Sequence, residues 1–140
     1  MPALKWPLTY LLLVGLLALG ASLWRGYGAS ETCEMDGQQL SPSLRVDLKM
    51  ADGTSHAFCT IACTQRWLAH QPRVAHKEAL VRDAITGEPL DAYVAFCVRS
   101  KLVTDRATGN DIHAFRFRTD ALEHVRRFGG RIIDDPFEVE

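Results

Sequence analysis

The sequence predicts an α+β fold in which duplicated ββα units pack into one small domain, preceded by one N-terminal transmembrane helix. Three features of the 140-residue chain lead to this prediction: a long uncharged segment near the N-terminus, strand and helix patterns that follow it, and a repeated His-Ala-Phe triplet. The predicted organisation is a membrane anchor or signal segment, a linker with a Cys-x-Met motif, the duplicated domain and an acidic tail, at residues 1–28, 29–43, 44–134 and 135–140.

The N-terminal segment has the length of a membrane span. Residues 6–24 contain no charged side chain over 19 positions, and Trp6 and Trp24 bracket them, as expected at the two interfaces of a bilayer. A cleaved signal peptide is the alternative, but no Ala-x-Ala site precedes a suitable cleavage point. Lys5 before the segment favours a single-pass protein of the inner membrane with its domain on the periplasmic side.

The remaining sequence alternates strand and helix patterns. Periodicity, Pro and Gly predict two strands joined at Asp52-Gly53, a helix that Pro72 ends, four further strands and a second helix capped by Thr119 and followed by Gly129-Gly130. The strands are expected at 44–50, 55–61, 79–83, 90–100, 113–117 and 131–133, and the first helix at 62–70.

The two His-Ala-Phe triplets indicate an internal duplication. They occupy residues 56–58 and 113–115, 57 positions apart, and each leads from a strand into a helix. One such unit buries little apolar surface, so two are expected to share a core.

Cys33 and Met35 form a Cys-x-Met motif in polar surroundings, where neither is needed for packing. Residues two apart on an extended strand point to the same side, and Cu(I) accepts thiolate and thioether ligands. Zn²⁺ prefers several Cys or His ligands without Met. The motif therefore favours copper over zinc, with an ordinary Met and a disulfide-bonded Cys as the alternative.

Cys59 and Cys63 are spaced as Cys-x₃-Cys at a strand-to-helix junction. Cys63 is expected near a helix N-terminus, where the dipole lowers a thiol pKa. The pair is interpreted as a second soft-metal site, as the completion of the Cys33–Met35 site, as a redox pair or as buried thiols, with Cys59 ranked behind Cys63 as a ligand. Cys97 lies in an apolar strand and is expected in the core.

Several segments together resemble the NosL family, copper chaperones of nitrous oxide reductase maturation. They are Cys33-Glu34-Met35, residues 83–92, Ser100, Ala114-Phe115 and Gly129-Gly130. The resemblance implies paired ββα units on the periplasmic side that bind Cu(I) through Cys33 and Met35. In many members a later Thr-Pro-Met-Gly turn supplies a further Met, whereas residues 104–109 contain none here. His113 follows this turn and is the candidate replacement, although a core position shared with His56 is the alternative.

The predicted function is a membrane-tethered Cu(I) metallochaperone, not an enzyme, that delivers copper to a metalloenzyme such as nitrous oxide reductase or to its maturation complex in the periplasm. The sequence contains no Ser-His-Asp order, phosphate-binding Gly loop or apolar carboxylate pair that would indicate catalysis. The predicted ligands are Cys33, Met35, Cys63 and His113. The alternatives are a thiol–disulfide protein that uses Cys59 and Cys63, and a non-catalytic accessory domain with structural disulfides.

Overall fold

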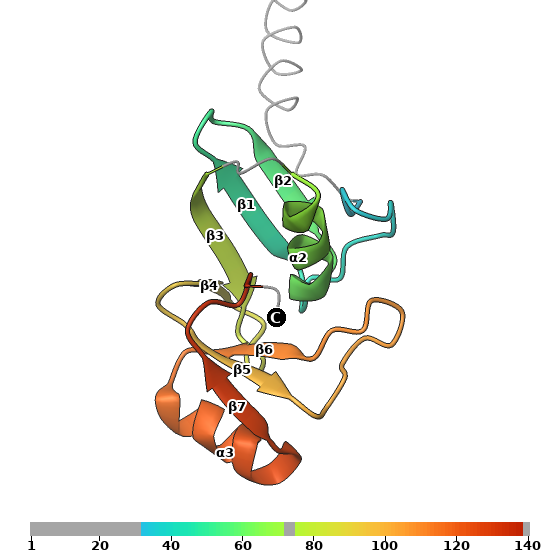
Figure 1. Ribbon diagram of the computed structural model, residues 1–140. Coiled ribbons are helices and arrows are strands. Elements are labelled where there is room, and N and C mark those ends of the chain that lie inside the picture. Colours follow the sequence, from blue (N-terminus) through green and yellow to red (C-terminus); the bar gives the residue numbers. More distant parts are fainter. Residues whose placement is uncertain (1–31, 72–74, 139–140) are drawn as a thin grey trace, which may run out of the picture.

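The computed structural model describes residues 32–71 and 75–138, which form two antiparallel sheets, each with one helix (Figure 1). The first sheet has the strand order β2-β1-β3-β4 and the second has the order β6-β5-β7. The elements follow the chain as β1 (Val46–Met50), β2 (Ser55–Phe58), α2 (Ile61–Ala69), β3 (His76–Arg82), β4 (Pro89–Asp91), β5 (Phe96–Ser100), β6 (Ile112–Phe115), α3 (Arg118–Phe128) and β7 (Gly130–Ile133).

The topology confirms the predicted duplication and adds one strand to each unit. In the first unit β1 pairs with both β2 and β3, and in the second β5 pairs in the same way with β6 and β7. The registers also match, because Leu48 faces His56 and Val98 faces His113. Each unit is therefore ββαβ, with the helix between its second and third strands.

The duplication includes a tight turn that precedes each unit. In residues 33–38, Cys33 N–H donates to Gln38 O at 2.8 Å and Gly37 N–H donates to Cys33 O at 2.8 Å. In residues 83–88, Asp83 and Gly87 make the same two bonds, to Glu88 O and to Asp83 O, also at 2.8 Å. The second residue of each turn donates its N–H to the Ala carbonyl of the corresponding His-Ala-Phe triplet. Glu34 donates to Ala57 O at 2.9 Å, and Ala84 donates to Ala114 O at 2.8 Å. Cys33 and Asp83 therefore occupy equivalent positions.

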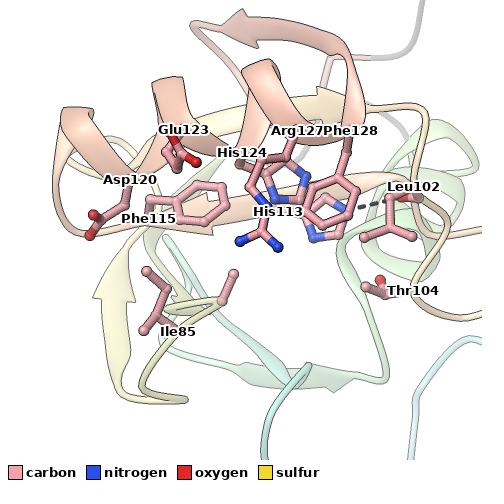
Figure 2. Close-up of a pocket in the computed structure, with 11 residues that line it drawn as sticks. Ile85, Leu102, Thr104, His113, Phe115, Asp120, Glu123, His124, Arg127 and Phe128 are labelled. Carbon is pink, nitrogen blue, oxygen red and sulfur yellow. Dashed lines mark hydrogen bonds between the residues drawn. The ribbon is translucent and has the colours of Figure 1, made fainter.

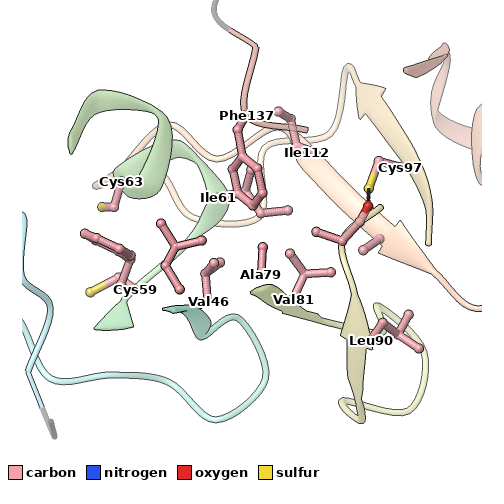
Figure 3. Close-up of a cluster of buried hydrophobic side chains, with 14 of the residues drawn as sticks. Val46, Cys59, Ile61, Cys63, Ala79, Val81, Leu90, Cys97, Ile112 and Phe137 are labelled. Carbon is pink, nitrogen blue, oxygen red and sulfur yellow. Dashed lines mark hydrogen bonds between the residues drawn. The ribbon is translucent and has the colours of Figure 1, made fainter. Parts of the chain in front are cut away.

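The two units share the larger of two apolar clusters, and the smaller one, Val98, Phe115 and Ala121, lies within the second unit. Side chains of β1, β2 and β3 pack with Cys97 of β5 and with Ile112 of β6 (Figure 3). Cys97 is buried, as predicted. Phe137 also enters this core and is only 7% exposed. The predicted acidic tail, residues 135–140, therefore contributes an apolar anchor, since Phe137 N–H is held by Asp135 Oδ1 at 2.8 Å.

Several predicted elements differ from the structure in their bounds. The strand expected at 55–61 ends at Phe58, and Ile61 already begins α2. Residues 90–100 form two strands and a turn, because Asp91 Oδ1 accepts a hydrogen bond from Tyr93 N–H at 2.9 Å and Asp91 O accepts from Ala95 N–H at 2.9 Å. The second helix begins after Phe117, whose carbonyl accepts from Asp120 N–H, so Thr119 lies within the first turn and is not its cap.

The described residues do not include the predicted membrane anchor at 1–28. Within residues 32–71 and 75–138, neither helix has the length and apolar character needed to span a bilayer.

Gly130 is required where β7 pairs with β5. Its φ is +114°, and a β-carbon added there would lie 2.1 Å from Arg99 O. Gly130→Ala is expected to lower the free energy of unfolding by about 2 kcal/mol or more, because the strand must shift and lose its pairing with Ser100. Gly53→Ala is the control, since its φ is +89° but its β-carbon would meet nothing within 4 Å. Urea unfolding compares the two, and equal losses would contradict the role of the contact.

Candidate metal centre

Three thiols and one carboxylate meet where the 33–38 turn contacts the start of α2. We call this group the thiol–carboxylate cluster; it consists of Cys33, Asp36, Cys59 and Cys63. One ligand atom each from Cys33, Asp36 and Cys63 lies within 4.8 Å of the others. Cys59 joins them through its backbone, because its N–H points at Cys33 Sγ at 3.3 Å.

The first unit positions each thiol by a different local structure. Gly37, with φ +71°, closes the turn that places Cys33 next to β2. Cys59 directly follows β2, and Cys63 lies in the first turn of α2, where its N–H donates to the side chain of the cap residue Thr60 at 3.2 Å. A strand end, a tight turn and a helix start therefore bring the three sulfur atoms together.

Asp36 connects the cluster to solvent. The thiol of Cys59 donates to Asp36 Oδ1 at 3.7 Å, and the thiol of Cys63 donates to Oδ2 at 3.6 Å. Burial raises the pKa of the Asp36 carboxyl, but hydrogen bonds from Gln38 N–H and from the thiols outweigh it, so the net shift is downward. The ionised carboxylate is exposed while the three thiols beneath it are buried.

Burial controls the protonation of Cys59 and Cys63. It raises the pKa of Cys63 to about 12 despite the opposing hydrogen bond from Thr60, and it also raises the pKa of Cys59. The predicted lowering of the Cys63 pKa at the helix N-terminus is therefore wrong, because desolvation of the thiolate is the largest effect and outweighs the hydrogen bond with the cap residue Thr60. All four cysteines are free thiols, and the two in this pair are protonated at neutral pH.

The Cys33–Met35 segment, in the predicted linker, is a turn and does not have the extended conformation in which both side chains would point to the same side. Cys33 is buried at 3% exposure, whereas Met35 lies on the outside of the turn at 37% exposure. Cys33 thus does not present exposed sulfur, and the thioether of Met35 is the accessible member of the pair.

His113 lies in the second unit and not with the cysteines. Its Nε2–H donates to Leu102 O at 3.0 Å, and its ring packs 4.4 Å from the ring of His124. The turn at residues 104–109 does contact the first unit, since Thr108 Oγ1 lies 3.2 Å from Thr60 Oγ1 beside the start of α2. It offers hydroxyl groups there and no thioether. Of the two predicted candidates for a further ligand, the structure therefore brings Cys63 to Cys33.

Asp36 is the cluster residue that the sequence did not single out. An Asp before Gly in a polar segment resembles an ordinary turn residue, and the repeated turn at residues 83–88 does not distinguish it, because Thr86 stands there at the position of Asp36. The second unit lacks the thiols, because Asp83, Arg116 and Asp120 stand at the positions of Cys33, Cys59 and Cys63.

The fold and the cluster define a class: small duplicated ββαβ domains whose first unit, within the described residues, groups buried thiols and an exposed carboxylate that could hold a metal ion. No family model and no curated protein matches the sequence. Among solved structures, the crystal structure of the copper chaperone NosL from Shewanella denitrificans is similar, with a TM-score of 0.62 and 19% sequence identity over 75% of this chain and 87% of that one. The chain therefore has the fold of NosL, as the sequence resemblance predicted.

Proposed function

We propose that the protein is a Cu(I)-binding metallochaperone. The observation that carries this proposal is the convergence of Cys33, Cys63 and Asp36 within 4.8 Å, with Cys59 against Cys33. Thiolates are the ligands that the soft ion Cu(I) prefers, and a metal displaces the thiol protons on binding. The similarity of the fold to that of a copper chaperone agrees with this choice.

The arrangement also suits a cargo that must be passed on. The thiols are buried, but Met35 and Asp36 lie at the surface beside them. An accessible thioether can hold Cu(I) while the thiolates are exchanged one by one for the ligands of a recipient. Such a site binds and transfers copper without catalysing a reaction.

The recipient and the location complete the proposal. The recipient is a copper-receiving metalloenzyme, such as nitrous oxide reductase, or its maturation complex. Residues 1–28 tether the domain to the inner membrane on its periplasmic side, because the uncharged segment at 6–24 has the length of a membrane span. These assignments extend the sequence resemblance and the shared fold.

Thiol–disulfide exchange is the second candidate, since three thiols lie together. A catalytic thiol of that kind needs a lowered pKa and access to its target. Here the thiols of Cys59 and Cys63 are buried and their pKa values are raised. The geometry therefore favours metal binding.

A competition titration tests the proposal. The reduced full-length protein is titrated with Cu(I) against a chromogenic Cu(I) chelator, and X-ray absorption at the copper edge reports the ligand atoms. We expect one equivalent of Cu(I) bound through at least two sulfur atoms. Failure to compete with the chelator, or copper bound only through nitrogen and oxygen, would overturn the proposed function.

A further inference from the structure

The side chain that joins the three thiols of the cluster is a carboxylate and not a thioether. The sequence favours copper over zinc because of Met35, but Met35 lies on the outside of the turn and Asp36 faces the thiols instead. A carboxylate is a ligand that Zn²⁺ takes together with cysteine thiolates, whereas the soft ion Cu(I) takes sulfur. Asp36 is therefore the member of the cluster that Cu(I) binding does not explain.

The number and spacing of the donors match a tetrahedral ion. Three thiols and one carboxylate supply four ligands, the coordination number of Zn²⁺ in sites built from protein side chains alone. Asp36 Oδ1 lies 3.7 Å from Cys59 Sγ, and Asp36 Oδ2 lies 3.6 Å from Cys63 Sγ. In a tetrahedral site with Zn–S bonds of about 2.3 Å and Zn–O bonds of about 2.0–2.2 Å, neighbouring sulfur and oxygen ligands lie roughly 3.6 Å apart. The free protein therefore already holds these donors at the separations that a zinc ion requires.

Backbone groups hold two of the donors in place. Cys33 Sγ accepts a hydrogen bond from Cys59 N–H at 3.3 Å, which supports negative charge on this sulfur. Asp36 Oδ1 accepts a hydrogen bond from Gln38 N–H at 3.1 Å, so the turn fixes the orientation of the carboxylate. Contacts of this kind orient metal ligands and raise the affinity of a site.

The second unit lacks this set of donors. The residues at the positions of Cys33, Asp36, Cys59 and Cys63 are Asp83, Thr86, Arg116 and Asp120. Figure 2 shows the cavity of about 320 Å³ that Asp120 lines, and none of the described residues around it is a cysteine. The guanidinium of Arg116 approaches Asp83 to 4.0 Å, so a protein cation stands where the first unit has thiols. The four donors are therefore a feature of the first unit and not of the shared framework.

We propose that the thiol–carboxylate cluster also binds Zn²⁺, with the thiolates of Cys33, Cys59 and Cys63 and the carboxylate of Asp36 as its four ligands. Binding releases the three thiol protons to solvent. Asp36 distinguishes the two metals, because Zn²⁺ uses its oxygen and Cu(I) uses the thiolates. The proposal goes beyond the proposed function, since Zn²⁺ needs the same thiols but not copper; only the exchange of one metal for the other rests on that function.

Metal titrations of the reduced full-length protein test this proposal. Co²⁺ is the probe, because tetrahedral Co²⁺ absorbs strongly in the visible range and its thiolate ligands add a charge-transfer band in the near ultraviolet. Zn²⁺ then displaces Co²⁺, and X-ray absorption at the zinc edge reports the ligand atoms. We expect one equivalent of Zn²⁺ with three sulfur ligands at about 2.3 Å and one oxygen ligand at about 2.0–2.2 Å. The absence of a tetrahedral Co²⁺ spectrum, or zinc with fewer than three sulfur ligands, would overturn the proposal.

Asp36→Asn and Asp52→Asn form a matched pair. Both aspartates are exposed in turns, and each accepts a hydrogen bond from the N–H two residues on, at 3.1 and 2.9 Å. The amide oxygen keeps that bond while the charge is lost, so both turns are preserved. Asp36→Asn is expected to weaken Zn²⁺ binding about tenfold or more and to leave Cu(I) affinity unchanged. Asp52→Asn is expected to change neither affinity, and an equal effect of the two variants on Zn²⁺ would overturn the proposal.

Adding Cu(I) to the zinc-loaded protein separates this proposal from the proposed function. We expect one equivalent of Zn²⁺ to be released to a zinc-sensitive dye, because the two ions need the same thiolates. Zinc that stays bound while Cu(I) binds would place the zinc site elsewhere and overturn the proposal. Because the Co²⁺ and Zn²⁺ titrations contain no copper, their failure leaves the proposed function standing, and a failure to bind Cu(I) overturns the proposed function alone.

Discussion

Replacing Cys33 or Cys63 by serine is expected to lower the affinity for Cu(I) by roughly 100-fold or more. Each change removes one soft thiolate from a group of three and leaves a hydroxyl that Cu(I) binds poorly. Even partners that only orient a metal ligand are worth about 10- to 100-fold in affinity, so a direct ligand is worth at least the upper end of that range. The competition titration with the Cu(I) chelator measures the loss.

The remaining sulfur residues serve as controls for that experiment. Cys97 is buried in the shared core, where its thiol points at Ala92 O at 4.0 Å, so Cys97→Ser is expected to affect stability and not copper affinity. Met35→Leu preserves size and removes the thioether, and we expect a smaller loss, about tenfold, because Met35 is exposed at the edge of the cluster. An unchanged affinity in both Cys33→Ser and Cys63→Ser would show that copper binds elsewhere.

The sequence identifies candidate ligands by residue type, but it does not predict their surroundings. It indicates soft sulfur at residues 33, 35 and 63, because the chemistry of Cys and Met is carried by the residues themselves. It does not predict that Cys33 is buried, since this depends on hydrogen bonds from the turn to Ala57 and Gln38. It also misses Asp36, whose role depends on two thiols that lie 23 and 27 positions away in the sequence.

The fold shows the same contrast between what local sequence patterns predict and what tertiary contacts decide. The duplication is visible in the sequence because the two His-Ala-Phe triplets occupy equivalent strands. The apolar stretch around residues 92–98 misleads, since Tyr93 and Val94 are exposed on a turn that Asp91 organises. Phe137 shows the opposite error, because its acidic neighbours hide a core residue. Local patterns predict elements, but tertiary contacts decide where they end.

The two units share one framework and differ in the length of one loop and in the side chains at the turn–helix junction. The offset between equivalent residues is 50 for the turns and first strands, and it becomes 57 after the loop at 101–111, which is longer than the loop at 51–54. Within this framework the first unit places thiols at the turn–helix junction and the second places Asp83 and Arg116, whose charged groups approach to 4.0 Å. Within the described residues, only the first copy therefore groups thiols at this junction.

The affinity for Cu(I) is expected to rise steeply with pH, by about tenfold per pH unit for each thiol that loses its proton. Binding converts thiols to thiolates, and protons compete with the metal below the thiol pKa. A raised thiol pKa therefore extends the pH dependence of the Cu(I) affinity to higher pH. For an ordinary exposed thiol the rise would level off near pH 8.5.

For Cys63, whose pKa burial raises to about 12, the rise continues through pH 10. With two ligand thiolates the expected change is about 100-fold per unit near neutral pH. The Cu(I) titration repeated from pH 6 to pH 10, with the chelator affinity known at each pH, measures the slope. Cys63→Ser is expected to reduce the slope of the logarithm of the affinity against pH by one, because one proton fewer is released on copper binding. Cys97→Ser is expected to leave the slope unchanged, although burial also raises the pKa of Cys97 to about 12. A wild-type slope that flattens near pH 8.5 would mean that the copper ligands are exposed thiols, and Cys63 would then not be among them.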